Sequence, residues 1–295
     1  MDKLLHPTGN FDNSAKEYKY IKVVPLASAL GAEIQKVDIS NMNDDMFLEI
    51  EDALYRHKMI YFRNQEITHK DQENFTLRFG EFGKDPYDKA TKGHNNVQQV
   101  VKEADTRTKM IFGSGWHTDT PFIETPPSIS MLYGVDIPPY GGDTMWVNSA
   151  LAFKNLSDKM KEVISPLKVL MSGEDVITAM KNDKKANNEG ENLGDVDTSS
   201  VAKGYYHPMV RTHPKTGEKS LYVDCTYARG IEGMTKDEAM PIINFLSAFA
   251  TQASFTCRLR WEKNTFVIWD NRICLHQAFN DYDGFRREMY RTMVQ

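Results

Sequence analysis

A histidine and an aspartate stand two residues apart in the segment Trp116-His117-Thr118-Asp119. In extended backbone, residues two apart point to the same side, so one imidazole and one carboxylate would face a common point. Two histidines and one carboxylate on one face of an iron ion leave coordination positions open for a cosubstrate and O2. Taken alone, the pair is a weak indication, because a surface pair near a turn has the same spacing.

A third ligand would have to be one of the later histidines, His207, His213 and His276. His207 and His213 each precede a proline, which is typical of extended residues just before a turn. His276 instead follows a predicted strand and the bend at 269–272, and it lies in an apolar stretch. A core histidine with a satisfied hydrogen bond is the alternative interpretation of His276.

Two arginines on the last predicted strand favour the ligand interpretation. Arg287 and Arg291 are separated by an even number of positions, so both side chains should face the same side of the strand. Inward guanidiniums are costly unless anions meet them, and arginine binds a carboxylate through two parallel hydrogen bonds. A dicarboxylate cosubstrate would supply one anion, and Thr144 could donate a hydroxyl to it. Acidic residues of the chain could instead pair with the arginines, and Thr144 could be an ordinary strand residue.

The elements that must position these residues are mainly strands in the second half of the chain. Helices are expected early and between groups of strands, at 43–57, 69–79, 151–164 and 235–250. Strands are expected at 20–24, 34–37, 59–62, 128–137, 144–147, 209–212, 220–223, 255–261, 265–269 and 285–294. This order predicts a mainly β, α+β class of fold, an antiparallel sandwich or barrel with helices packed outside.

One stretch, from about 172 to 204, is polar and rich in Asn, Asp, Lys, Gly and Ser. It is longer than an ordinary connection, and such segments are usually lids over functional sites or disordered insertions. We therefore expect a single domain over residues 1–295, with an active-site lid at about 172–204.

The overall composition argues against several classes of protein. The chain has 36 Lys and Arg, 41 Asp and Glu and a formal net charge of −5, without a basic run, so neither nucleic acid nor a membrane surface is an expected partner. It lacks the apolar segment of a signal peptide or a bilayer span. Cys225, Cys257 and Cys274 are far apart, which favours a reducing compartment over a disulfide framework. These features predict a cytoplasmic protein.

Several segments together resemble the taurine and aryloxyalkanoate dioxygenase family, over nearly the whole chain from about Val24 to Val294. The segments that carry the likeness are Trp116–Asp119, Phe122–Pro127, Gly141–Thr144, Trp269–Arg272, His276 and Arg286–Arg291. The resemblance implies a double-stranded β-helix, the cupin-like jelly roll. It also implies an enzyme that uses Fe(II), 2-oxoglutarate and O2 to hydroxylate a small anionic organic molecule, releasing succinate and CO2.

The same resemblance implies roles for individual residues. His117, Asp119 and His276 match the iron ligands of the family. Thr144 and Arg287 match its contacts to 2-oxoglutarate. An iron centre with a cosubstrate site beside it is therefore the expectation for this chain.

The chain differs from taurine enzymes at the positions that are expected to contact the substrate. Arg291 matches the residue that meets the acidic group of the substrate, and Trp269 matches an aromatic residue beside the cofactor site, which a core position would also explain. Taurine enzymes carry a histidine where Asp85 aligns, an asparagine where Gly113 aligns and a tyrosine near Tyr87 or Asp88. These differences argue against taurine itself as the substrate.

Other interpretations stay open at the level of sequence. The same three ligands could bind zinc in a hydrolase, which would not need the arginine and the threonine for a second anion. A protein that binds 2-oxoglutarate without catalysis is a further alternative. The stretches 231–235 and 255–258 are nearer the aryloxyalkanoate branch, which does not make a herbicide the natural substrate. We expect a homo-oligomer, a dimer or a tetramer.

Overall fold

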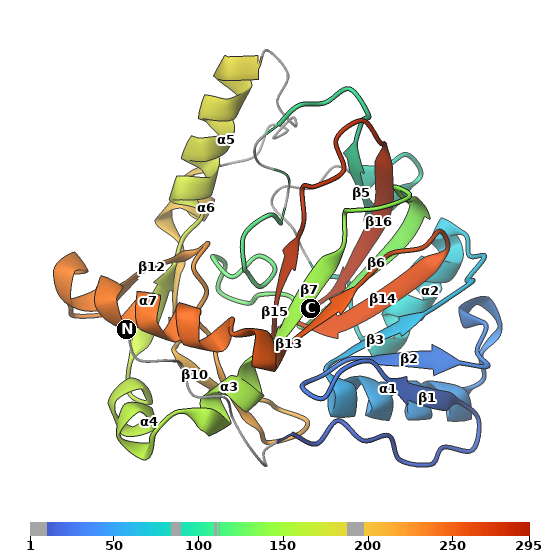
Figure 1. Cartoon of the computed structure of the whole chain (residues 1–295), viewed down its shortest axis with the longest axis horizontal. Helices are drawn as coiled ribbons and strands as arrows, with labels where there is room; N and C mark the ends of the chain where they lie inside the picture. Colours follow the sequence, from blue (N-terminus) through green and yellow to red (C-terminus); the bar gives the residue numbers. More distant parts are fainter. Residues whose placement is uncertain (1–10, 84–89, 109–110, 112, 188–197) are drawn as a thin grey trace.

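The structure is a computed structural model that describes residues 11–83, 90–108, 111, 113–187 and 198–295 (Figure 1). Over these residues the chain is mainly β, with helices packed around the sheets, as the sequence predicts. None of the helices described is both long and apolar enough to cross a membrane.

The larger sheet has eight strands and forms one side of the candidate site. In order across the sheet, they are β1 (Lys22–Pro25), β2 (Ala32–Gln35), β3 (Met59–Phe62), β14 (Thr265–Asp270), β6 (Ile129–Asp136), β16 (Arg287–Val294), β5 (His94–Lys102) and β4 (Ala90–Thr91). Neighbouring strands are antiparallel except for the parallel pair β2–β3. Every residue of β14 is buried, so this strand is covered on both faces.

A second, three-stranded sheet packs against the first and forms the other side of the site. Its strands are β13 (Thr256–Leu259), β7 (Thr144–Asn148) and β15 (Cys274–Ala278), with β7 in the middle. Trp146 of β7 meets Trp269 of β14 edge-on, with ring centroids 5.9 Å apart. The inner faces of the two sheets are therefore in contact, which brings residues far apart in the sequence together.

Two helices cover the outer face of the larger sheet (Figure 1). They are α1 (Asp44–His57) and α2 (His69–Phe79), and the short η1 (Ile39–Asn41) precedes them. Thr68 and Asp71 form a reciprocal capping box that starts α2. Phe75 of α2 packs edge-on against Phe62 and Phe266 of the sheet, so a second apolar core lies beneath these helices.

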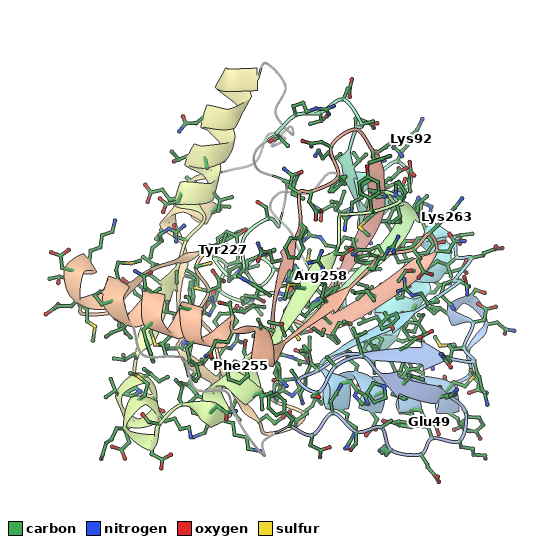
Figure 2. All side chains as sticks on the ribbon, viewed as in Figure 1. Glu49, Lys92, Tyr227, Phe255, Arg258 and Lys263 are labelled. Atoms are coloured by element: carbon green, nitrogen blue, oxygen red, sulfur yellow. The ribbon has the colours of Figure 1, made fainter. Side chains whose placement is uncertain are left out.

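The remaining elements lie beyond the smaller sheet. They are the sheet β12 (Ala228–Ile231), β8 (Lys168–Met171) and β9 (Tyr205–Pro208), the hairpin β10 (Val210–Thr212) and β11 (Lys219–Leu221), and the helices α3 (Ser149–Asn155), α4 (Asp158–Ile164), α5 (Glu174–Asn187), α6 (Thr198–Lys203), α7 (Lys236–Ala250) and η2 (Ala253–Phe255). The buried Phe255, labelled in Figure 2, packs against Phe249 of α7 with ring centroids 5.6 Å apart. This contact joins the outer layer to the start of β13.

Most predicted elements are present, with boundaries shifted by a few residues. The apolar residues that alternate along 255–261, Phe255, Cys257, Leu259 and Trp261, are all buried. The single helix predicted over 151–164 is wrong, because α3 ends at Asn155 and the next helix begins after Ser157. The Ser157 hydroxyl accepts a hydrogen bond from the Met160 amide, and this local cap replaces helical continuation. No strand is predicted from the sequence at β4, β5, β8, β9, β12 or β15, the last of which carries His276.

The polar stretch 172–204 contains α5 and α6 over its described residues, and 188–197 lie outside them. Val201 of α6 is fully buried, and the Ser172 hydroxyl donates to the Ala202 carbonyl over 2.6 Å, so α6 is anchored in the core. Helix α5 extends away from the body of the molecule in Figure 1. The described residues of this stretch are therefore largely helical, and the lid role stays a prediction.

Candidate active site

Three buried side chains converge between the two sheets: His117, Asp119 and His276. Their nearest candidate donor atoms all lie within 4.8 Å of one another. Asp119 Oδ1 is 4.0 Å from His117 Nε2 and 3.8 Å from His276 Nε2. Two atoms bound to one ion through bonds of about 2.1 Å are at most about 4.2 Å apart. Both imidazole–carboxylate distances therefore fit a shared metal ion.

The backbone explains why these residues meet. His117 and His276 form an antiparallel bridge, in which each backbone amide donates to the carbonyl of the other, over 3.0 and 2.7 Å. Thr118, between the two ligand candidates, points the other way, and its hydroxyl donates to the Asn271 carbonyl over 2.9 Å. The predicted alternation of His117 and Asp119 is thus present, and β15 supplies the second histidine.

The protonation states of the cluster suit a divalent cation. Burial alone would raise the pKa of Asp119, but the Arg291 guanidinium, aided by the two imidazoles, brings that pKa down to about 2. Burial, with the neighbouring His117 ring, lowers the pKa of His276 to about 3, and burial also lowers the pKa of His117. At neutral pH the cluster therefore holds one carboxylate and two neutral imidazoles, which are the forms that bind metal.

The tautomer of His117 follows from its partner. Its Nδ1 lies 2.7 Å from the Gly115 carbonyl oxygen. Because a carbonyl oxygen only accepts, Nδ1 carries the proton, and Nε2 presents its lone pair toward Asp119. His276 Nε2 also faces Asp119, while Nδ1 of His276 has no hydrogen-bond partner among the described residues.

The other two candidate histidines are engaged elsewhere. His207 Nε2 lies 2.8 Å from the Pro121 carbonyl oxygen, and His213 Nε2 lies 2.8 Å from Asp270 Oδ2. Both are buried residues whose partners belong to the scaffold around the site. They fit the role of core histidines, which leaves His276 as the third member of the cluster.

Arg291 lies against the cluster and is bound by the chain itself. Its Nη1 donates to Asp119 Oδ1 over 2.9 Å, and its Nε donates to Gln98 Oε1 over 2.7 Å. Gln98 stands opposite Arg291 in the pairing of β16 with β5. The alternative in which an acidic residue of the chain pairs with this arginine is therefore present, and contact with a substrate stays a prediction for Arg291.

Arg287, on the same face of β16, has a different environment. The side chain is buried, and its Nε and Nη2 make no hydrogen bond within the described part of the chain. The aromatic rings of Trp261 and Tyr282 lie 5.7 and 5.9 Å from the guanidinium carbon. Burial lowers the pKa of Arg287, and the nearby Tyr282 hydroxyl and Asp143 carboxylate offset only part of that cost. Such a group is well suited to bind an anionic ligand.

Thr144 and the glycines before it shape the space next to Arg287. Thr144 is buried at the start of β7, and its hydroxyl oxygen accepts from Trp261 Nε1 over 2.9 Å. Gly142 has φ +66°, and a Cβ there would lie 3.2 Å from Arg287 Cδ. The double glycine therefore allows the turn and gives the arginine room.

A cavity of about 40 Å³ connects these groups. It is lined by Val100, Gly113, His117, Leu132, Thr144, Trp269, His276, Ala278, Arg287 and Arg291. Gly113 has φ +84°, and a Cβ there would lie 3.2 Å from His117 Cε1, so a larger residue would crowd that imidazole. Trp269 packs beside the site with its ring 4.8 Å from that of His276. Asp85 and Tyr87, the other expected substrate contacts, lie outside the described residues.

A buried carboxylate near the site has no sequence signal. Asp224 is fully buried, and its Oδ1 accepts from the backbone amides of Thr226 and Tyr227 over 2.9 and 2.6 Å. Burial raises its pKa to about 6. The Thr226 hydroxyl donates to the Trp116 carbonyl over 2.8 Å, which ties this turn to the ligand segment. Tyr227, labelled in Figure 2, lies with its ring 6.1 Å from that of His117.

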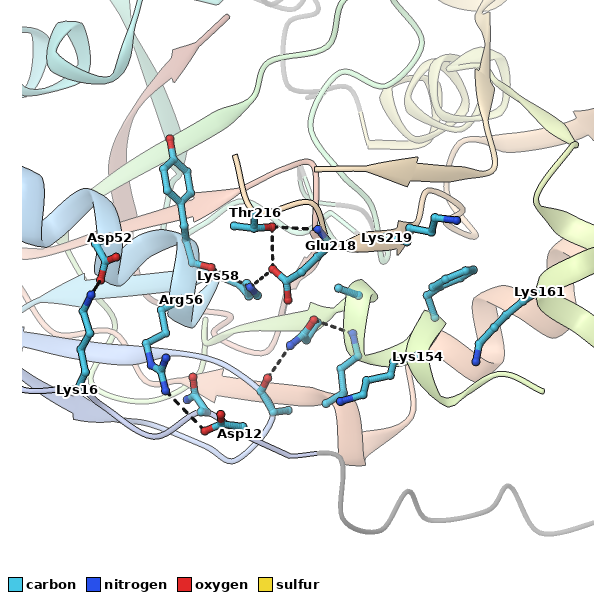
Figure 3. A pocket seen from close by; sticks show the side chains of 17 residues that line it. Asp12, Lys16, Asp52, Arg56, Lys58, Lys154, Lys161, Thr216, Glu218 and Lys219 are labelled. Carbon is cyan, nitrogen blue, oxygen red and sulfur yellow. Dashed lines mark hydrogen bonds and ion pairs between the residues drawn. The ribbon is translucent and has the colours of Figure 1, made fainter. Parts of the chain in front are cut away.

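A larger cavity, of about 710 Å³, is lined by the N-terminal segment, α1, α3 and the β10–β11 turn (Figure 3). Its lining contains none of the residues that the sequence singles out for chemistry. Each carboxylate in it is engaged by a cation, in the pairs Lys58–Glu218, Lys16–Asp52 and Arg56–Asp12. It is separate from the cluster described above.

Known proteins are similar to this chain over most of its length. The family model described as taurine catabolism dioxygenase TauD, TfdA family matches residues 22–293. An alkylsulfatase of Acinetobacter baylyi is 33% identical over 91% of this chain and 83% of its own length. An alpha-ketoglutarate-dependent sulfate ester dioxygenase of Pseudomonas putida is 34% identical over 93% of this chain and 89% of its own. A solved structure, a taurine dioxygenase from Burkholderia xenovorans, has a TM-score of 0.77 at 32% identity, covering 94% of this chain and 91% of that one.

Proposed function

The chain belongs to the TauD, TfdA family, and from that premise we propose that it is an Fe(II)-dependent enzyme that oxidises organic sulfate esters. It is an oxidoreductase that depends on 2-oxoglutarate, also called alpha-ketoglutarate. The observation that carries the proposal is the buried pair of imidazoles and one carboxylate beside the buried guanidinium of Arg287, whose Nε and Nη2 have no hydrogen-bond partner among the described residues. A zinc hydrolase would have no use for that guanidinium.

In this proposal His117, Asp119 and His276 hold the iron. The ion, when bound with 2-oxoglutarate and O2, supplies the oxidation of a C–H bond while 2-oxoglutarate becomes succinate and CO2. The protein residues hold the ion in place and exclude water from it, which their burial supports. The two packed sheets with the ligands between them are further proposed to form a double-stranded β-helix.

Arg287 and Thr144 are proposed to bind the distal carboxylate of 2-oxoglutarate. Both are buried and line the cavity that contains the two imidazoles. The Thr144 oxygen already accepts a hydrogen bond from Trp261, so its proton is directed elsewhere and can be donated to a carboxylate. Arg287 would neutralise the same group through charge-assisted hydrogen bonds.

The substrate class rests on the relatives and on chemistry. Two relatives at 33% and 34% identity are named for sulfate esters, and Arg291 beside the cluster is proposed to contact the acidic group. Hydroxylation of the carbon that carries the sulfate oxygen gives an unstable product, which releases hydrogen sulfate and leaves an aldehyde. One alkyl sulfate, one O2 and one 2-oxoglutarate then give one aldehyde, one hydrogen sulfate, one succinate and one CO2.

An O2-uptake screen tests this assignment. Medium-chain alkyl sulfates are expected to give sulfate and succinate in equal amounts, with a kcat/KM at least about tenfold above that for taurine, a difference of about 1.4 kcal/mol in transition-state binding. Alkanesulfonates and phenoxyacetate serve as comparison substrates. Succinate formation with those compounds but not with any sulfate ester would contradict the substrate class and leave the reaction class intact.

We also propose that residues 172–204 act as a lid of one domain spanning residues 1–295. Hydrogen exchange of their backbone amides is expected to slow when metal, 2-oxoglutarate and substrate are bound together, because closing protects exposed hydrogen bonds. Asp175 of α5 already reaches Arg229 of β12 over 2.7 Å, which gives the lid one attachment point. Helix α2, on the far face of the larger sheet, is the internal control and should not change. Equal exchange with and without ligands over 172–204 would rule out the lid.

A further inference from the structure

A chain of buried hydrogen bonds leads away from the back of the Asp119 carboxylate. The Ser130 hydroxyl donates to Asp119 Oδ2 over 2.5 Å. Asn271 Nδ2 donates to the Ser130 hydroxyl oxygen over 2.7 Å, and Trp269 Nε1 donates to Asn271 Oδ1 over 2.8 Å. Each member is at most 3% exposed, so water does not compete for these bonds.

The direction of every bond in this chain is fixed by chemistry. The indole nitrogen of Trp269 can only donate, so the amide oxygen of Asn271 must face it. The amide nitrogen of Asn271 then faces Ser130 and uses its hydroxyl oxygen as acceptor. The hydroxyl proton is left to point at Asp119. Oδ2 thereby accepts from Ser130, and Oδ1 accepts from Arg291 Nη1. Oδ1 is the oxygen that lies 4.0 and 3.8 Å from the Nε2 atoms of His117 and His276.

The scaffold holds this chain rigidly. Ser130 and Trp269 stand directly opposite each other in the pairing of β6 with β14, at the centre of the larger sheet. The Asn271 backbone is bound on both sides, because its amide donates to the Ser128 carbonyl and its carbonyl accepts from Thr118. The polar groups therefore sit on elements that cannot shift without breaking sheet pairing.

We propose that Ser130 and Asn271 are positioning residues that restrict Asp119 to binding the metal through one oxygen, Oδ1. An ion with two imidazoles and a single carboxylate oxygen keeps more positions open than one chelated by both oxygens. A cosubstrate that chelates the metal and O2 both need such positions. This inference rests on the proposed function for the ion, and it adds residues that neither the ligand motif nor the family likeness assigns here.

Cobalt(II) titration of the whole protein under anaerobic conditions tests the proposal without turnover. Ser130→Ala is expected to lower Co(II) affinity by about 10–100-fold, as is typical when a group that hydrogen-bonds to a ligand is lost. The ligand-field spectrum of the bound Co(II) should also change, because Oδ2 becomes available for coordination. Ser130→Thr, which keeps the hydroxyl, should retain parental affinity and spectrum, and Ser130→Cys, with its weaker donor, should fall between them.

Ser220→Ala is the matched control. Ser220 is also fully buried, and its hydroxyl donates to the Arg272 carbonyl over 2.9 Å, outside the Asp119 chain. Its replacement should change unfolding temperature but neither Co(II) affinity nor spectrum. A Ser130→Ala protein with parental affinity and spectrum would overturn the proposal, as would equal losses in Ser220→Ala. If Ser130→Ala does not fold, the comparison of Ser130→Cys with Ser130→Thr decides between the same outcomes.

Failure of the proposed iron site gives a different pattern. In that case the parent protein itself would bind Co(II) no better than His276→Ala. The Ser130 variants would then also show the same weak Co(II) affinity as the parent. If the parent binds Co(II) tightly and the Ser130 variants match its affinity and spectrum, the positioning role is refuted and the proposed iron site is not.

Discussion

Replacement of His276 by alanine is expected to abolish succinate formation and to weaken binding of Fe(II) by more than about 100-fold. Loss of a group that only hydrogen-bonds to a metal ligand costs about 10–100-fold in affinity, so loss of a ligand must cost more. His117→Ala and Asp119→Ala should behave alike, because each leaves two of the three donor groups that lie within 4.8 Å of one another. Anaerobic metal titration and a succinate assay with saturating 2-oxoglutarate measure the two effects.

His57→Ala provides the control for loss of a buried histidine. His57 is fully buried on α1, and its Nδ1 lies 2.7 Å from Asn13 Oδ1, in the N-terminal segment. Its loss should lower the unfolding temperature while metal stoichiometry remains that of the parent. Full turnover of Asp119→Ala under iron-limited conditions would contradict the ligand assignment.

The ligand motif could be predicted because its geometry is local. Alternation along an extended backbone places His117 and Asp119 on one side without any knowledge of the fold. The choice of His276 over His207 and His213 depended on the prolines after the other two and on the pair of arginines beyond His276, and the structure gives each rejected histidine its own partner. The even spacing of the two arginines likewise required nothing beyond strand periodicity.

The partners of those residues could not be predicted, because they are set by sheet register. Gln98 meets Arg291 through the pairing of β5 with β16, and Ser130 reaches Asp119 from a strand whose neighbours are far away in sequence. A shift of one residue in either pairing would send these side chains to the opposite face. No local pattern around Gln98 or Ser130 encodes which register is adopted.

The same limit applies to the stretch 172–204. Its composition is polar, which favours an interpretation as loop or insertion. The buried Val201 and the hydrogen bond from Ser172 to Ala202 show that tertiary contacts anchor helix α6 there. Helix formation in proteins depends mainly on such packing, and one sequence does not reveal it.

Arg287→Met is expected to separate function from stability more sharply than any other substitution in the site. Two charge-assisted hydrogen bonds to a carboxylate contribute about 1.5–3 kcal/mol each, so their loss should raise the KM for 2-oxoglutarate at least about a hundred-fold. Arg287→Lys should recover only part of this, because a lysine lacks the planar pair of donors. Initial rates at varied 2-oxoglutarate concentration measure the effect.

The ligand-free Arg287→Met protein should nevertheless unfold at a higher temperature than the parent. The guanidinium is buried, and its Nε and Nη2 have no hydrogen-bond partner within the described residues, so an apolar side chain of similar length removes a desolvation cost. Added 2-oxoglutarate and Mn(II) should stabilise the parent but not the variant. Arg291→Met is the matched comparison on the same strand. It should lower the unfolding temperature, because it leaves the buried Asp119 carboxylate without the Nη1 donor that lies 2.9 Å away.

The two arginines should also differ in what they bind. Arg291→Ala is expected to raise the KM for the primary substrate far more than the KM for 2-oxoglutarate, whereas Arg287→Ala should do the reverse. The physical basis is position: Arg291 contacts the carboxylate of the cluster, and Arg287 lies with Thr144 along the cavity. If Arg291→Ala instead weakened 2-oxoglutarate and Arg287→Ala weakened the primary substrate, the two assignments would have to be exchanged. A ligand-free Arg287→Met protein less stable than the parent would mean that this guanidinium has a structural partner rather than a place for a cosubstrate.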